Sequence, residues 1–348
     1  MRFYQRQHAF YCGVDLHARK MYVTVVDREG TTLVQRNLDA GPERFLSLVR
    51  PYREGLIVGC ECMFAWYWLA DLCRGEAIDF VLGHALYMKA IHGGKTKNDR
   101  IDSEKIARLL RGGMFPQAYV YPHEMRATRD LLRRRTHLVR LRTDALAHVE
   151  NSVSQYNLPA VEKKLRFAAN RAGVAEQFAD PAARRMIESD LALAAHLDEQ
   201  IRAVELHLVH SARVDDPQAY QRLQSIPGVG KILALILLYE IHDVGRFADV
   251  RNFVSYCRLV RPRHESNGKV STAAKKKKIG NAPLRWALGE AACLMLREVP
   301  QAKSLVARLE KKHGKAKALS ILAARIARAV YWMLRRKEAF DVNKCFQN

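Results

Sequence analysis

Four acidic side chains stand where a metal-dependent site for phosphoryl transfer could form. Asp15 lies near the end of an expected strand and Glu61 ends another. Asp99 and Asp102 are three residues apart, on one face of an expected helix. Strand ends and one helical turn can meet in space. Carboxylate oxygens suit Mg²⁺ or Mn²⁺, and two such ions about 3.5 to 4 Å apart stabilise the attacking and leaving oxygens of phosphoryl transfer.

Each of these carboxylates alone also has a simpler explanation. Asp102 could complement the positive end of its helix, and Asp15 could cap a turn before Ala18. Glu61 is harder to explain in this way, because a carboxylate in an apolar strand is costly unless a partner compensates its charge. A metal ion would be such a partner. The residues by themselves leave the metal site and the structural roles open.

A possible nucleophile, Ser266, lies in the most basic stretch of the chain. Residues 251–285 contain ten Lys or Arg and one acidic residue, Glu265. Ser266 precedes a flexible Asn267-Gly268, and the surrounding cations could hold a phosphate and stabilise the charge that develops on its oxygens. The pattern alone favours a loop serine in a phosphate-contacting turn, and Ser271 is close enough to be a rival nucleophile.

The charge balance of the chain indicates a polyanionic partner. The 58 Lys and Arg against 36 Asp and Glu leave a formal charge of +22. Nucleic acid is therefore the leading partner class, ahead of an acidic membrane surface. The side chains of the basic stretch that we expect to contact a DNA or RNA backbone are Lys269, Lys275, Lys276, Lys277, Lys278 and Arg285.

A second nucleic-acid-binding element is predicted at residues 223–241. The pattern indicates a helix, a tight turn at Ile226-Pro-Gly-Val-Gly230, and a second helix from Lys231. Gly228 and Gly230 permit close approach of a phosphate that a Cβ would block, and the second helix presents its first amides to an anion. This resembles the helix-hairpin-helix motif of sequence-neutral DNA binding. A plain helical turn with a glycine cap is the alternative.

The elements that must position these residues change in kind along the chain. Residues 1–122 alternate strand and helix signals, which is an α/β order. The expected strands are 10–16, 21–26, 32–38, 56–60 and 78–82, and the expected helices are 42–53, 64–74 and 99–111.

Residues 123–213 give no convincing strand signal. Leucines recur at helical spacing among many arginines and predict long paired helices, as in a coiled-coil arm. Within them, Arg133, Arg134 and Arg135 form either a solvated helix face or a nucleic-acid contact. Residues 214–348 are then a third, C-terminal domain.

Composition excludes several classes of protein. With 49% hydrophobic and 27% charged residues, the chain is neither wholly disordered nor collagen-like. Its longest apolar runs, such as 232–239, are too short to cross a bilayer, and the first residues lack a signal core, so we expect a cytoplasmic protein. The seven scattered cysteines contain no C-x-x-C pair and are expected to be reduced packing thiols.

The motifs together resemble those of the DEDD-type insertion-sequence transposases, a family of bridge-RNA-guided recombinases that includes the pilin-gene invertases. They follow the family order over nearly the whole chain. The matching segments are Gly13-Val-Asp-Leu-His17, Gly59-Cys-Glu61, Lys95-Thr-Lys-Asn-Asp-Arg-Ile-Asp-Ser103, Ile226-Pro-Gly-Val-Gly230, Ser266-Asn-Gly-Lys269, Gly280-Asn281 and Leu284-Arg285. Many members have Ser-Gly where this chain has Ser266-Asn267-Gly268.

The resemblance implies an RNase H-like, RuvC-type N-terminal domain in which Asp15, Glu61, Asp99 and Asp102 hold divalent metal. It also implies a helical arm used in subunit contact and a C-terminal transposase domain that supplies Ser266. In such enzymes the serine forms a covalent phosphoserine intermediate with DNA, and the two domains build a composite site across subunits. The implied partners are donor and target DNA, a noncoding bridge RNA that pairs with both, and further copies of the chain in a dimer or tetramer.

Two other functions remain as hypotheses from the sequence. A structure-selective nuclease would use only the carboxylates and water, without a serine nucleophile. A noncatalytic nucleic-acid scaffold would bind through its charge alone, with the steep salt dependence that counterion release requires.

Overall fold

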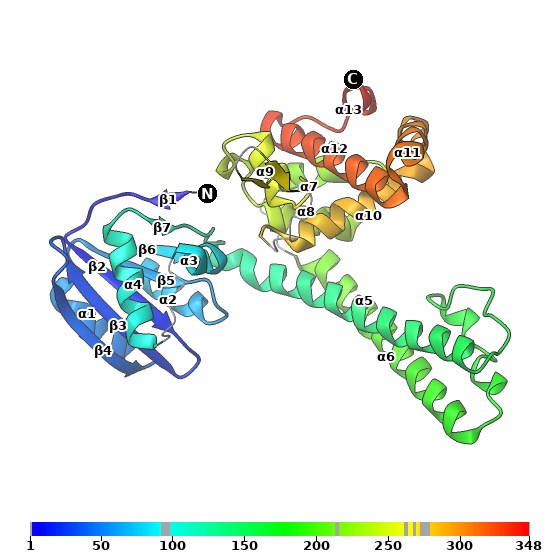
Figure 1. Ribbon diagram of the computed structural model, residues 1–348, viewed down its shortest axis with the longest axis horizontal. Coiled ribbons are helices and arrows are strands. Elements are labelled where there is room, and N and C mark those ends of the chain that lie inside the picture. The colour runs from blue at the N-terminus through cyan, green and yellow to red at the C-terminus, as the bar shows by residue number, and fades with distance from the viewer. Residues whose placement is uncertain are drawn as a thin grey trace. The chain divides into compact units, whose positions relative to one another are not determined.

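The computed structural model describes residues 2–91, 98–212, 216–260, 264–266, 269–271 and 279–347. The chain divides into two compact units, Met1–Glu124 and Met125–Asn348 (Figure 1). Within the described part of the chain, none of the helices combines the length and the apolar character needed to span a bilayer.

A five-stranded mixed sheet forms the centre of the N-terminal unit. Its strand order is β4-β3-β2-β5-β6. The strands β4, β3 and β2 are antiparallel neighbours, whereas β2, β5 and β6 run parallel. The sheet strands are β2 (Phe10–Leu16), β3 (Lys20–Asp27), β4 (Thr32–Asp39), β5 (Leu56–Glu61) and β6 (Asp79–Gly83). Strands β1 (Phe3–Tyr4) and β7 (Phe115–Pro116) form a separate antiparallel pair. The helices are α1 (Pro42–Val49), α2 (Trp66–Gly75), α3 (Ala85–Ile91) and α4 (Asp99–Arg111), with a 3-10 turn at Arg50–Tyr52.

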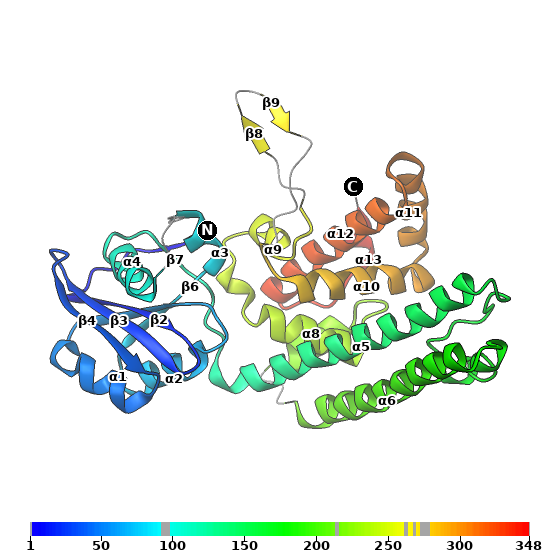
Figure 2. The same cartoon turned by 60° about the horizontal axis from the view of Figure 1, so that its bottom comes forward.

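Helices cover both faces of this sheet. Figure 2 shows α4 on one face and α1 with α2 on the other. Successive side chains of a strand point to opposite faces, so Cys12 and Val14 of β2 pack in the core with α1 and α2. Tyr11 instead packs in the core that contains α4. Gly13 and Asp15 therefore share the face on which α4 lies.

Helix α4 approaches β2 so closely that Gly13 has no room for a side chain. A Cβ there would lie 2.1 Å from the carbonyl oxygen of Ser103 and 2.5 Å from the amide nitrogen of Ala107. The helix starts where the sequence predicts, because Asn98 caps it by accepting a hydrogen bond from the Arg100 amide. The first turn of α4, with its two acidic residues, is thereby held at the carboxyl end of β2.

The C-terminal unit is mostly helical. Residues 123–212, all of which the structure describes, contain helices and 3-10 turns but no strand, in agreement with the helical pattern of the sequence there. Its helices are α5 (His123–Gln155), α6 (Pro181–Ser211), α7 (Pro217–Gln224), α8 (Lys231–Ile241), α9 (Val250–Tyr256), α10 (Ala282–Glu298), α11 (Pro300–His313), α12 (Lys315–Arg336) and α13 (Val342–Phe346). Two short strands, β8 (His264–Ser266) and β9 (Lys269–Ser271), pair antiparallel, and 3-10 turns lie at Ala168–Asn170, Ala175–Gln177 and Val244–Arg246.

Helices α5 and α6 lie side by side and antiparallel (Figure 2). Three ion pairs follow the antiparallel order, because their α5 residues advance along the chain as their α6 residues go back. These pairs are Arg135–Glu205, Arg142–Asp198 and His148–Asp190. Apolar contacts among Leu138, Leu197 and Ile201 lie between them. Arg135 therefore makes an internal ion pair, and Arg133 makes one with Glu240 of α8. Neither interpretation of these arginines from the sequence foresaw this.

A buried carboxylate, Glu240, joins three helices of the C-terminal unit. Its side chain is 2% exposed. From α5, Arg129 donates to it from Nε and Nη2 at 3.1 and 2.9 Å, and Arg133 from Nε and Nη2 at 2.6 and 3.1 Å. From the start of α10, Asn281 Nδ2 donates at 2.7 Å. Burial opposes ionisation, but the arginines and the amide outweigh it and lower the pKa of Glu240.

All seven cysteines are free thiols, as expected, and five of them are buried.

We expect Gly13→Ala to destabilise the chain by about 1 to 3 kcal/mol, because the new methyl group would meet backbone atoms of α4 that cannot rotate away. Gly75→Ala is the matched control. Gly75 has open space around its Cβ position and lies at the end of a helix. Urea unfolding of both variants measures the effect, and equal stability of the two would contradict this account of the packing.

We expect Glu240→Gln to cost about 3 kcal/mol at neutral pH, because two guanidinium groups lose a buried charged partner. The folded-state pKa of Glu240 is lowered, so its stabilisation is present above its ordinary value of 4.5 and is lost as pH falls through the folded-state pKa. The difference in unfolding free energy between wild type and variant should therefore shrink in acid. Urea titrations at several pH values test this, and a difference that grows with acidity would contradict it.

Candidate metal centre

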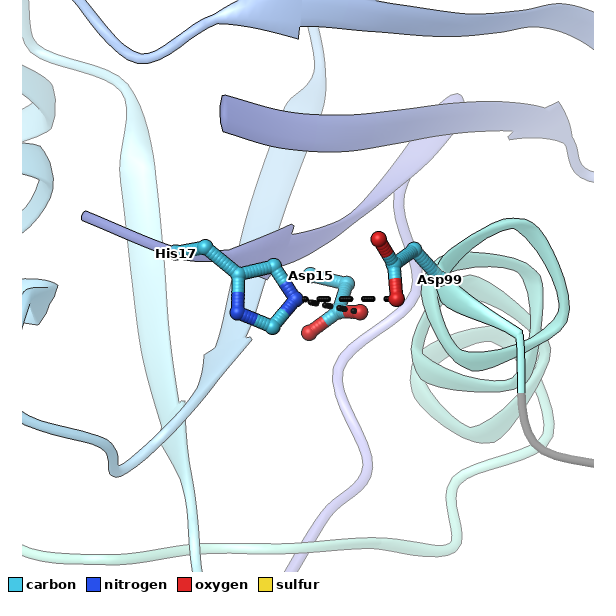
Figure 3. A group of neighbouring side chains, drawn as sticks. All are labelled: Asp15, His17 and Asp99. Carbon is cyan, nitrogen blue, oxygen red and sulfur yellow. Dashed lines mark ion pairs between the residues drawn. The ribbon is translucent and has the colours of Figure 1, made fainter. Parts of the chain in front are cut away.

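Three side chains meet at the carboxyl end of β2. His17, directly after the strand, places Nε2 3.4 Å from Oδ2 of Asp15 and 3.6 Å from Oδ1 of Asp99, the first residue of α4 (Figure 3). One potential ligand atom from each residue lies within 4.8 Å of the others. The close packing of α4 on β2 thus brings together residues that are more than eighty positions apart in the chain.

The electrostatic setting of Asp15 favours a cationic partner. Its side chain is 15% exposed, whereas those of His17 and Asp99 are more than half exposed. Burial raises the pKa of Asp15, while the neighbouring imidazole lowers it. The carboxylates of Asp99 and Asp102 also raise this pKa by repulsion. A divalent cation would relieve both the desolvation and the repulsion.

Glu61 and Asp102 lie near this group but outside it. The strand register pairs Val14 with Cys60, so Glu61 is the next residue beside Asp15 and alternates onto the same face of the sheet. The side chain of Asp102 contacts Lys105 Nζ at 3.3 Å. Asp102 also lies in the first turn of its helix, where negative charge is favourable. The structural role suggested for it is therefore compatible with a second role at the site.

The donor set fits a divalent ion. Carboxylate oxygens suit Mg²⁺ and Mn²⁺ alike, while an imidazole nitrogen is accepted more readily by Mn²⁺.

The residue that sequence reasoning missed is His17. The spacing Asp15-Leu-His17 was the available signal, because alternate residues at a strand end lie on one side of it.

The two glycines of the predicted helix-hairpin-helix turn have different structural roles. Gly228 has a φ of +83°, and a Cβ there would lie 2.6 Å from the Cβ of Leu294 in α10. Packing against α10 thus explains Gly228 without a phosphate. Gly230 is exposed with nothing within 4 Å of its Cβ position, and Lys231 beside it is exposed as well. The open side of the turn is at these two residues.

Comparison with known proteins matches both units of the chain. Residues 12–158 match a DEDD-type family described as "Transposase", and residues 220–307 match the "Transposase IS116/IS110/IS902 family". The chain belongs to this transposase family. The first match contains the four predicted carboxylates, and the second contains the glycine turn, Ser266 and the start of α10.

Curated relatives support this assignment over almost the full length. The chain is 26% identical to the transposase for insertion sequence element IS1111A of Coxiella burnetii, with 94% of this chain and 90% of the relative covered. It is 25% identical to a probable family 20 transposase of Pseudomonas aeruginosa, with 94% and 97% covered. A transposase for IS1328 of Yersinia enterocolitica is 24% identical, with 92% and 95% covered.

As a transposase the protein binds DNA, and its DEDD domain implies the use of divalent metal.

The basic residues expected to contact nucleic acid are only partly described. Arg285 is exposed. Burial is the main cause that lowers the pKa of Arg258, and the positive charge of Arg285 lowers it further. The backbones of Ser266 and Lys269 pair across the β8–β9 hairpin. Their side chains lie outside the described part, as do Lys275, Lys276, Lys277 and Lys278 entirely.

We expect Asp15→Asn to weaken Mn²⁺ binding by roughly tenfold or more, because the amide keeps the shape of the side chain and removes its charge. Calorimetric titration of the full-length transposase measures the affinity. Glu104→Gln is the control, since this carboxylate of α4 pairs with Arg108 outside the group. Unchanged affinity in Asp15→Asn would rule out the carboxylate group as the cation site.

Proposed function

We propose that this transposase cuts and rejoins DNA through a serine nucleophile, Ser266, with Mg²⁺ or Mn²⁺ held by Asp15, Glu61, Asp99 and Asp102. The observation that carries the proposal is the meeting of Asp15 with the first turn of α4 in a domain matched as DEDD-type. When bound, the metal would supply Lewis-acid stabilisation of charge on the phosphate oxygens.

The proposed reaction needs a hydroxyl nucleophile and a cationic setting. The Ser266 Oγ would attack phosphorus, forming a phosphoserine bond and releasing a DNA hydroxyl that takes up a proton. Rejoining is the reverse step with a different DNA hydroxyl as the nucleophile. Lys269 and Arg285 would neutralise the backbone phosphates, together with the four lysines at 275–278. Gly230 and Lys231 would contact a further phosphate at the start of α8, in a turn of helix-hairpin-helix type.

The fold and the partners follow the same proposal. The sheet order β4-β3-β2-β5-β6, with three antiparallel strands followed by two parallel ones, supports an RNase H-like, RuvC-type domain. A bridge RNA that pairs with donor and target DNA would read sequence by base pairing, in keeping with a formal charge of +22. A dimer or tetramer formed through the helical arm would complete a composite site between subunits.

We expect Ser266→Ala to abolish a covalent protein–DNA adduct, because alanine has no hydroxyl that could attack phosphorus. The assay combines the purified transposase, the RNA of its own element, Mg²⁺ and end-labelled DNA, followed by denaturing gels. Ser271→Ala, which changes the rival serine of the same hairpin, should keep the adduct.

Other outcomes identify the competing functions. Adduct that persists in Ser266→Ala would refute the assignment of the nucleophile. Free DNA ends without any adduct would indicate a nuclease that uses only carboxylates and water. Wild-type protein that binds DNA but leaves it uncut, with the same binding in Asp15→Asn, would indicate a noncatalytic nucleic-acid scaffold.

A further inference from the structure

Residues that precede and follow the Ser266-bearing stretch in sequence meet at one place, which we call the neck: Tyr256, Arg258, Gly280 and Asn281. The backbone amide of Asn281 donates to the carbonyl of Tyr256 at 2.6 Å. Arg258 Nε donates to the carbonyl of Gly280 at 2.9 Å. Gly280 has a φ of +100°, and a Cβ there would lie 2.6 Å from the Tyr256 carbonyl oxygen. The two ends of the segment are therefore held against each other.

The side chain of Asn281 does three things at the neck. Its Oδ1 accepts from the amide of Leu284 at 2.9 Å and so caps α10. Its Nδ2 donates to Glu240 Oε2 at 2.7 Å and to the hydroxyl of Tyr256 at 3.2 Å. Asn281 is 5% exposed and Glu240 is 2% exposed, so these bonds form away from water. A helix cap alone needs only the first contact, and the other two link both ends of the segment to the buried carboxylate.

Glu240 also connects the neck to the helical arm. Arg129 and Arg133 of α5 both donate to it, and the guanidinium of Arg246 donates to its backbone carbonyl at 3.2 Å. A buried carboxylate saturated in this way has few alternative geometries, because each displaced donor would stay unpaired in the interior. The neck is thereby held in a fixed position relative to α5.

We propose that Glu240 and Asn281 are positioning residues for strand transfer, which orient the serine-carrying segment by fixing its neck to the arm helix α5. The inference rests on the proposed role of Ser266 as the nucleophile. Both residues would act through the neck, and no contact with the reacting atoms is assigned to them. Their effect is on the geometry of attack, where displacements of about 1 Å can cost roughly a hundredfold in rate.

The test variant is Asn281→Ser in the full chain. Serine is a good helix cap and so preserves the contact with Leu284, but it is too short to reach Glu240. We expect the single-turnover rate of adduct formation at saturating DNA to fall by roughly tenfold or more. The dissociation constant for DNA should stay close to wild type. Loss of the buried bond to Glu240 should lower the midpoint of thermal unfolding, so rates are compared at a temperature where both proteins are fully folded. Asp216→Ser, which changes the cap of α7 away from the neck, should leave all three quantities unchanged.

A second comparison tests whether Asn281 acts through Glu240. If it does, the double variant Glu240→Gln with Asn281→Ser should transfer strands no more slowly than Glu240→Gln alone. Independent, multiplying losses would overturn the coupling. A wild-type rate in Asn281→Ser, or a loss explained entirely by weaker DNA binding or by unfolding, would overturn the positioning role.

The controls separate this inference from the proposed function. If wild type forms no adduct, or if Ser266→Ala keeps it, the serine mechanism fails and the positioning role fails with it. If wild type forms a Ser266-dependent adduct and Asn281→Ser forms it equally fast, only the positioning role fails.

Discussion

The close contact between α4 and β2 at Gly13 is the constraint on which the carboxylate group depends. The helix can sit that low only because no side chain intervenes. Its capped first turn then lies at the end of the strand, where Asp15 points to the same face. The opposite face of the sheet is apolar and packs on α1 and α2. The face under α4 has its own apolar core, and the acidic groups lie at its edge, at the end of β2.

A buried carboxylate has a comparable function in the helical unit. Isolated burial of Glu240 would be costly, and the network of guanidinium and amide donors compensates this cost. Apolar residues of similar volume would stabilise the same helices without directional contacts. The ionic arrangement adds a fixed geometry between the arm helix and the neck, which an enzyme that must aim a nucleophile can use. The charge network around Glu240 and the carboxylate group around Asp15 each fix the relative positions of two elements by directional contacts.

The likeness to known transposases extends across both units, and each match covers the residues on which the proposed chemistry depends. The carboxylates lie in the first match and the serine in the second. The proposed cleavage and rejoining of DNA strands uses metal chemistry, a nucleophile and contacts to phosphates. This chain carries candidates for each of these in residues whose spacing alone was suggestive.

Local sequence determined much of the fold. The helix at Asp99–Arg111 was predicted with its observed bounds, because its cap, its acidic first turn and its apolar spacing all lie within the segment. The strand Phe10–Leu16 was predicted for the same local reason. Tertiary structure alone decided that His17 joins Asp15 and Asp99, that Arg133 pairs with Glu240, and that Gly228 packs against α10. Each of these depends on a partner far away in the chain, and periodicity carries no information about which distant residue will supply the contact.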